Sequence, residues 1–303
     1  MNGILFALTV VIWGTTWLAI ALQVGPVPVL VSVFYRFATA GLVFLAALAL
    51  TGRLRLPGRA HQPWILAQAL CLFCLNFICF YEAAAHIPSG LISVIFSLAT
   101  VFNAVNARLF FGDPITRRTL LASALGVAGL VFLFGRDFAV AQPDGTLAGI
   151  ALAGLGTLLF SLGNMVSRRN SAAGLPPATV NAWGMGYGAL ALLGLIFATG
   201  TPIVAPPGAT YIGAMLYLAV IGSVVGFTTY LVLVARIGQV HRAEDVRGYV
   251  VFFDLPQDTF GEGDAIGAVL QALLFVFGQR PEARRAVAGC MKGQAEQDQE
   301  NDQ

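Results

Sequence analysis

A lone arginine stands inside a long apolar run of this sequence. Arg36 lies in SVFYRFATA, residues 32–40. A charge surrounded by apolar residues needs a partner or water. Arg36 is therefore either a contact for a solute carboxylate or a gate, or a structural arginine bonded to backbone carbonyls or reaching outward. Residue type and position leave both interpretations open.

Two tryptophans form a second candidate feature. Trp13 and Trp17 are separated by four residues, so a helix places both indoles on one face. They would form an aromatic wall for an apolar or aromatic solute, or would simply pack. The remaining candidate substrate-binding residues are aromatic or polar side chains of other apolar runs: Tyr35, Asn76, Tyr81, Ser97, Asn103, Asn164 and Trp183. Amides in lipid must be hydrogen-bonded, so they face the interior as interhelical contacts or as cavity lining. Tyr81 ends its run, which also predicts an anchor at the membrane interface.

Catalytic, metal and nucleotide chemistry is not indicated. An intramembrane enzyme would need clustered acid–base or metal-binding groups, yet the histidines are scattered. Cys71 and Cys74 form C-x-x-C without a second ligand pair, so packing thiols are expected. The chain has no G-x-x-x-x-G-K pattern, and its single lysine is Lys292. We expect no catalytic residue, no metal and no cofactor.

The composition requires a membrane to position these residues. Hydrophobic residues make up 57% of the chain and charged residues 11%, whereas ordinary soluble domains carry about 25% charged residues. A membrane-spanning helix needs about 20 apolar residues. Eight such runs occur, at approximately 4–22, 29–50, 64–81, 90–111, 119–135, 147–166, 179–199 and 211–235. The sequence therefore predicts an all-α integral membrane protein, with the first run retained as a span.

The connections between these runs alternate in charge. Those after the second, fourth and sixth runs carry seven arginines: Arg53, Arg55, Arg59, Arg117, Arg118, Arg168 and Arg169. Those after the first, third, fifth and seventh carry Arg136 alone. Positive connections face the cytoplasm, so the pattern predicts a cytoplasmic N-terminus.

The sequence also repeats internally at an offset of about 148 residues. TVVIWGTTW (9–17) overlays TLLFSLGNM (157–165), and residues 76–80 fall on 223–227. Five spans per copy reverse the orientation of the second copy, which gives an inverted repeat with a substrate site between the halves. We predict a first five-helix unit at 3–136 and a second, incomplete unit at 147–238.

WGTTW (13–17), SVFYRFATA and FSLATVFNAVNARLFFGDPIT (96–116) resemble the EamA branch of the drug/metabolite transporter superfamily, over residues 3–238. The resemblance implies ten helices in two five-helix inverted repeats, both termini cytoplasmic. It further implies a secondary transporter of the bacterial inner membrane that exports amino acids or other small metabolites. The partners would be a small-molecule substrate and the lipid bilayer, with no nucleic acid, and a homodimer is compatible with this plan.

The resemblance stops after residue 238. Residues 239–303 contain eleven of the fifteen acidic residues and form a polar, divergent tail, where a ninth and a tenth span are expected. A shifted reading frame or a natural cytoplasmic tail would explain this change. A chain that lacks the last two spans would be a non-transporting remnant, which is the alternative to an active exporter.

Overall fold

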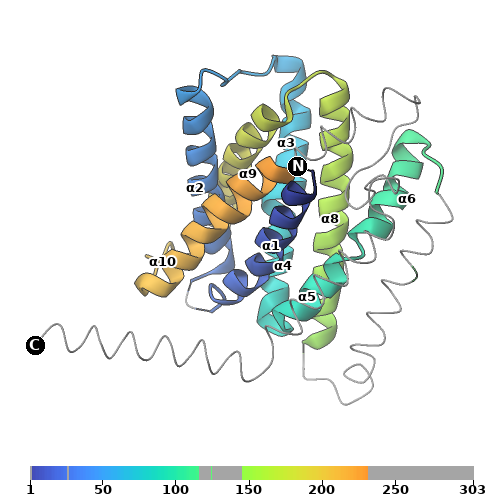
Figure 1. The fold of residues 1–303 in the computed structure, drawn as a ribbon. Helices are drawn as coiled ribbons and strands as arrows, with labels where there is room; N and C mark the ends of the chain where they lie inside the picture. The colour runs from blue at the N-terminus through green and yellow to red at the C-terminus, as the bar shows by residue number, and fades with distance from the viewer. Residues whose placement is uncertain (1, 26, 116–123, 125–144, 231–303) are drawn as a thin grey trace, which may run out of the picture.

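The fold is a bundle of helices (Figure 1). The structure is a computed structural model that describes residues 2–25, 27–115, 124 and 145–230. These residues form helices and connections without a strand, so the predicted all-α fold is confirmed for them. The helices are α1 (Asn2–Ala21), α2 (Val29–Leu50), η1 (Arg59–His61), α3 (Gln62–Leu70), η2 (Cys71–Leu75), α4 (Asn76–His86), α5 (Ser89–Phe96), α6 (Ala99–Phe111), α8 (Thr146–Ala172), α9 (Pro177–Thr199), α10 (Gly208–Leu216) and η3 (Tyr217–Val225).

Six helical stretches of the described residues are long and apolar enough to cross a membrane. They are Val29–Leu50, Arg59–His86, Ser89–Phe111, Thr146–Ala172, Pro177–Thr199 and Gly208–Tyr230. The apolar part of α1, Ala7–Ala21, is shorter. The predicted span at 119–135 and the tail at 239–303 lie outside the described residues. The chain is thus a multi-pass membrane protein.

Two predicted spans are too short. The third helix continues beyond Tyr81 to His86, because the next residues are mainly alanines, good helix formers, and the helix stops just before Pro88. Helix α8 continues beyond the predicted limit of 166 to Ala172, because no glycine or proline interrupts it before Gly174, which has a φ of +81°.

The third and the eighth spans both contain π-helical turns. Segment η2 covers Cys71–Leu75 and η3 covers Tyr217–Val225. Such turns are rare within helices and are found frequently at functional sites. At the offset of 148 residues, 71–75 corresponds to 219–223, which lies inside η3. The two halves therefore share an unusual backbone feature at matching positions.

The helices of the two halves pack against each other. Helix α2 packs on α9, α4 packs on α8, and α1 packs on η3. At the first of these contacts a Cβ on Gly41 would lie 3.1 Å from the backbone nitrogen of Gly186. A side chain at position 41 would require the neighbouring backbone to shift by a few tenths of an ångström.

Two pairs of glycines with G-x-x-x-G spacing lie at close contacts between helices. Cβ atoms on Gly184 and Gly188 of α9 would lie 3.0 Å and 2.9 Å from Phe73 atoms. Cβ atoms on Gly222 and Gly226 of the eighth span would lie 2.9 Å and 2.6 Å from atoms of α1. These glycines let α9 and the eighth span approach the first half closely.

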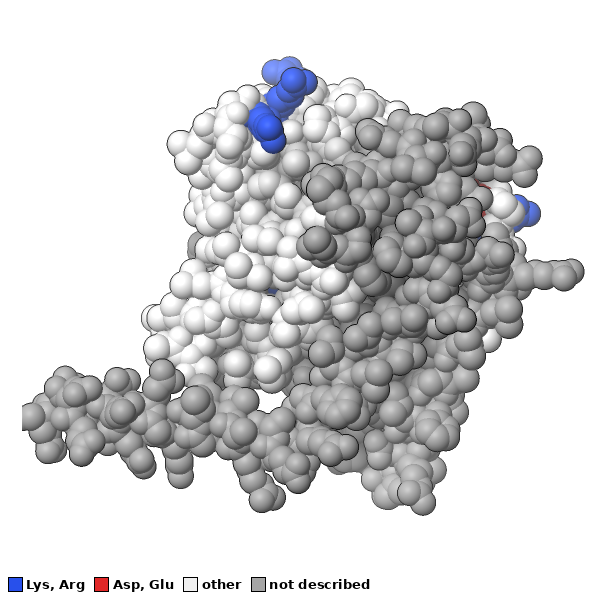
Figure 2. All heavy atoms as spheres, viewed as in Figure 1, with Lys and Arg blue, Asp and Glu red and all other residues white. Residues whose placement is uncertain are grey.

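Arginines gather at one end of the bundle, which we call the basic end. It lies where α2, α6 and α8 finish and α3 begins, and Figure 2 shows blue side chains at the top and right edge of that view. Its members are Arg53, Arg55, Arg59, Arg108, Arg168 and Arg169. The described arginines of the alternating connections thus lie at the same end of the bundle, whereas Arg117, Arg118 and Arg136 lie outside the described residues.

Candidate functional site

The guanidinium of Arg36 lies at the contact between the two halves. Arg36 is 2% exposed, and its Nε donates a hydrogen bond of 3.2 Å to Ser223 Oγ in η3. Its Cζ lies 4.3 Å from the ring centre of Phe77, which is a cation–π contact. The buried Nη1 has no hydrogen-bond partner. A charge on the first half is therefore held partly by a hydroxyl of the second half.

Helices α1, α2, α4 and η3 converge around this guanidinium. A Cβ on Gly222 would meet Thr16 Cγ2 at 2.9 Å and Arg36 Nη2 at 3.7 Å. The hydroxyl of Tyr81 interacts electrostatically with Arg36 and donates a hydrogen bond of 2.7 Å to Gln23 Oε1. Tyr81 is fully buried, so the prediction of an interface anchor is wrong: the helix runs on beyond it and places its ring inside the bundle.

No carboxylate balances this charge among the described residues. Their two acidic side chains are Glu82 and Asp113, and the one ion pair they form joins Asp113 to Arg168. A buried charge without a counter-ion is costly, and such groups in membrane segments mark substrate or ion pathways. Arg36 is therefore the strongest candidate for a functional group in the described part of the chain.

Two aromatic rings, Phe77 and Phe37, lie near the guanidinium, and further rings continue from Phe77. Phe77 packs on Phe37 and Phe80, with ring centres 4.8 Å and 6.1 Å apart. Trp17 packs on Phe80 at 5.4 Å, whereas Trp13 packs on Phe227 at 5.3 Å. The two tryptophans thus contact different helices, Trp17 the first half and Trp13 the second.

The predicted amides lie elsewhere, mainly between α6 and α8. Asn164 Nδ2 donates to Asn103 Oδ1 over 3.5 Å, and Asn106 Nδ2 donates to Ser161 Oγ over 2.9 Å. These contacts fit the interpretation of amides as interhelical contacts. Asn103 Nδ2, however, is buried without a hydrogen bond.

Asn76 is the most isolated of the amides. It is 0% exposed, and neither Oδ1 nor Nδ2 has a hydrogen-bond partner. It follows η2 directly and precedes Phe77, which contacts Arg36. An unsatisfied buried amide costs about 1–3 kcal/mol, so its place beside the candidate site calls for a functional reason.

The polar groups of three further predicted residues form hydrogen bonds with backbone carbonyls and not with Arg36. The hydroxyl of Tyr35 donates to the carbonyl of Val204 over 3.1 Å. Ser97 Oγ donates to the Val94 carbonyl over 2.6 Å, where α5 gives way to α6. Trp183 Nε1 donates to the Arg55 carbonyl over 2.9 Å at the basic end.

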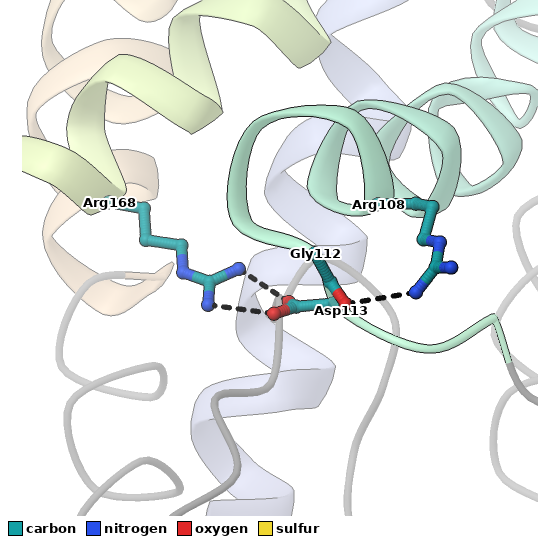
Figure 3. Close-up of polar contacts among 4 residues, drawn as sticks. All are labelled: Arg108, Gly112, Asp113 and Arg168. Carbon is teal, nitrogen blue, oxygen red and sulfur yellow. Dashed lines mark hydrogen bonds and ion pairs between the residues drawn. The ribbon is translucent and has the colours of Figure 1, made fainter.

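An ion pair closes the basic end between α6 and α8. Arg168 binds both carboxylate oxygens of Asp113, at 2.6 Å and 3.2 Å, and stacks on Phe111 with its Cζ 4.0 Å from the ring centre. Arg108 Nη1 donates to the carbonyl of Gly112 over 3.1 Å. Figure 3 shows Arg168 and Arg108 on either side of the turn at Gly112 and Asp113. A bidentate pair fixes orientation as well as charge.

A buried amide network joins the halves at the same end. Gln68 of α3 donates to Asn181 Oδ1 of α9 over 2.7 Å and accepts from Asn170 Nδ2 of α8 over 3.0 Å. Next to this network Arg169 stacks on Trp64, with its Cζ 3.7 Å from the ring centre. The sequence predictions missed this network, because glutamines and asparagines at helix ends look like ordinary surface residues.

Ser223 was also missed as a site residue, although a signal for it existed. The internal repeat places it opposite Asn76, so an inverted repeat puts both near the shared centre. Phe77 gave no such signal, because a phenylalanine in an apolar run is ordinarily a packing residue.

Known proteins resemble this chain over most of its length. YedA, an inner membrane transporter of Escherichia coli (strain K12), is 27% identical over 236 residues, which are 78% of this chain and 74% of YedA. PecM of Dickeya dadantii (strain 3937) is 24% identical over 223 residues, 71% of this chain and 69% of PecM.

A solved crystal structure shares the fold. Its TM-score is 0.63 at 20% identity, and the alignment covers 92% of this chain and 87% of the other. The sequence profile of the EamA-like transporter family matches residues 1–135 and 147–241. This match covers most of the chain and both predicted repeats, so the protein belongs to the EamA-like transporter family.

Proposed function

We propose that this chain is a secondary transporter that exports small metabolites, such as amino acids, by alternating access. Arg36 carries this proposal, because it is a buried cation of the first half whose hydrogen-bond partner, Ser223, belongs to the second half. A site shared between the halves is reshaped whenever one half tilts against the other.

The packing of the halves supports an inverted repeat as the basis of this movement. The predicted repeat pairs the first span with the sixth and the third with the eighth. Under that pairing the α4–α8 contact corresponds to the η3–α1 contact, and both are present. The π-helical turns η2 and η3 lie in the paired third and eighth spans. Each π turn would give its helix a local point of bending at the level of the site.

The basic end would face the cytoplasm in this proposal, with the N-terminus on that side. Membrane proteins retain arginine-rich connections in the cytoplasm. The Asp113–Arg168 pair and the Gln68 network would then close the cytoplasmic side of the path. Export would require these contacts to open and re-form in each cycle.

Counterflow in proteoliposomes tests the proposal. The purified full chain is reconstituted, the vesicles are loaded with an unlabelled amino acid mixture, and entry of the labelled mixture is followed. We expect uptake above that of protein-free vesicles. Arg36→Gln should abolish most of it, whereas Arg53→Gln, which removes an exposed arginine of the basic end, should retain it.

The outcomes separate the competing interpretations. Uptake that depends on Arg36 supports a transporter with a central site. Uptake unaffected by Arg36→Gln would refute the role of Arg36. The absence of uptake, across amino acids and related metabolites, would instead favour the non-transporting remnant, for which the divergent residues 239–303 are the sequence observation.

A further inference from the structure

The charge balance around Arg36 restricts the kind of solute that the site accepts. We infer that it selects solutes with one negative charge and no positive charge: carboxylates attached to an apolar or aromatic body. The inference rests on the proposed site between the halves. Among the small metabolites of the proposed function it ranks such anions above zwitterionic amino acids, which would bind more weakly.

The donor groups favour a carboxylate. Arg36 uses Nε for its bond to Ser223, while the buried Nη1 carries unused N–H groups. A guanidinium binds planar oxyanions such as carboxylates through parallel N–H donors, and it binds phosphates in the same way. A carboxylate matches the single charge of Arg36, whereas a phosphate dianion would leave an excess negative charge in the buried site. Ser223 is itself satisfied, because its hydroxyl donates to the Leu218 carbonyl over 2.9 Å. The unmet hydrogen-bonding capacity of the Arg36–Ser223 pair is thus that of a donor, and the unpartnered acceptor beside the site, Asn76 Oδ1, carries no charge.

The lack of a nearby acid argues against a solute ammonium group. Within the described residues Asp113 is committed to Arg168 at the basic end, and no carboxylate lies within ion-pair distance of Arg36. A monoanion would leave the buried site neutral. A zwitterion would leave the charge of Arg36 uncompensated overall and would add a desolvated ammonium, which is costly inside a membrane protein.

The surroundings favour an apolar body on the carboxylate. Phe77 covers the guanidinium, the Phe37 ring centre lies 5.3 Å from Arg36 Cζ, and Phe80 packs on Phe77. The Gln23 carbonyl near Tyr81 already accepts the tyrosine hydroxyl. The guanidinium is covered on all sides in this conformation, so a solute enters when the halves separate.

A matched set of three probes tests the inference. The compounds 3-phenylpropionate, phenylalanine and phenethylamine share one apolar body and carry, respectively, a negative charge, both charges and a positive charge. Equilibrium binding of radiolabelled 3-phenylpropionate to the purified full chain in detergent is measured, with the other two as competitors. We expect saturable binding of 3-phenylpropionate and at least tenfold weaker competition by phenylalanine and by phenethylamine.

The variants assign the binding to the guanidinium. Arg36→Gln should weaken 3-phenylpropionate binding at least tenfold, Arg36→Lys should retain part of it, and Arg53→Gln should bind like the unmodified chain. Thermal unfolding of each variant is recorded in parallel. If Arg36→Gln proves misfolded, the comparison of Arg36→Lys with Arg53→Gln and the ranking of the three probes still decide the matter.

Equal or tighter binding of phenylalanine, the absence of saturable 3-phenylpropionate binding, or unchanged binding in a folded Arg36→Gln variant would each overturn the inference. Binding needs the halves to separate once but does not need a complete transport cycle, so the result is distinguishable from that of the counterflow assay. Anion binding without transport would support the inference and refute the transport proposal. Transport of amino acids without a preference for anions would support the transport proposal and refute the inference.

Discussion

Gly188 of α9 provides a quantitative test of how closely the halves approach. A Cβ at this position would lie 2.9 Å from Phe73 Cβ, 3.0 Å from the Phe73 carbonyl oxygen and 3.2 Å from its carbonyl carbon. Two of these atoms are backbone atoms, so a rotamer change cannot relieve the contact. Gly188→Ala must therefore push α9 away from η2, which we expect to cost about 1–3 kcal/mol as overpacking.

Gly194→Ala is the matched control on the same helix. A Cβ there would meet nothing within 4 Å, so this substitution contributes only the helix preference of alanine, about 0.5–1 kcal/mol of stabilisation. That preference is common to both variants and cancels in their difference. The difference between the two variants is then the overpacking cost, which corresponds to a Tm gap of several degrees at about 2–4 °C per kcal/mol.

A thiol-reactive fluorescent dye measures this gap. Cys74 and Cys79 are buried, so they react when the bundle opens on heating. We expect Gly188→Ala to unfold at a clearly lower temperature than Gly194→Ala in the same detergent. Equal unfolding temperatures would mean that α9 does not approach η2 as described, and the shared centre around Arg36 would lose its packing basis.

Three further predictions concern the basic end. Asp113→Asn and Arg168→Gln should each lower the free energy of unfolding by up to about 1 kcal/mol, since the two side chains are 18% and 26% exposed. The double variant should be no less stable than the more damaging single variant. Additive losses in thermal unfolding would contradict the pairing. Asn170→Ala should cost about 1–3 kcal/mol of stability, because it leaves the buried Gln68 amide oxygen without its donor. Asn164→Ala should cost less, because the hydrogen bond from Asn164 to Asn103 is 3.5 Å long. The reverse order in the same assay would be inconsistent with the network. Cysteines replacing Arg53 and Arg168 should react with a membrane-impermeant thiol reagent in inside-out vesicles and not in intact cells, and labelling of either from outside would refute the proposed orientation.

The sequence predicted the elements better than the contacts. Apolar runs between prolines indicated the described spans, because hydrophobic length is the main requirement for crossing a bilayer. Their ends were predicted less well, because α8 stays helical through charged residues such as Arg168 until Gly174. Hydropathy predicts the apolar part of a helix and not the polar turns that extend it.

Only some residues of the candidate site could be predicted from the sequence. Arg36 was found because a charge in an apolar run is conspicuous, and Trp17 because of its helical spacing. Ser223 lies far from Arg36 along the chain, and only the packing of the halves brings it to the guanidinium. Phe77 has an ordinary residue type and reaches the guanidinium through the packing of α4 on α2 within the first half. The π-helical turn that carries Ser223 has no signature in composition or periodicity.

Access to Ser223 from the two sides of the membrane tests the central claim most directly. Ser223→Cys, a nearly isosteric change, is introduced where the four native cysteines are replaced, and a cationic, membrane-impermeant thiol reagent is applied to right-side-out and inside-out vesicles. Leu192→Cys, equally buried on α9, is the control. We predict that position 223 reacts from both sides and position 192 from neither. Reaction of position 223 from one side only, or from neither, would contradict alternating access to a site shared by the two halves.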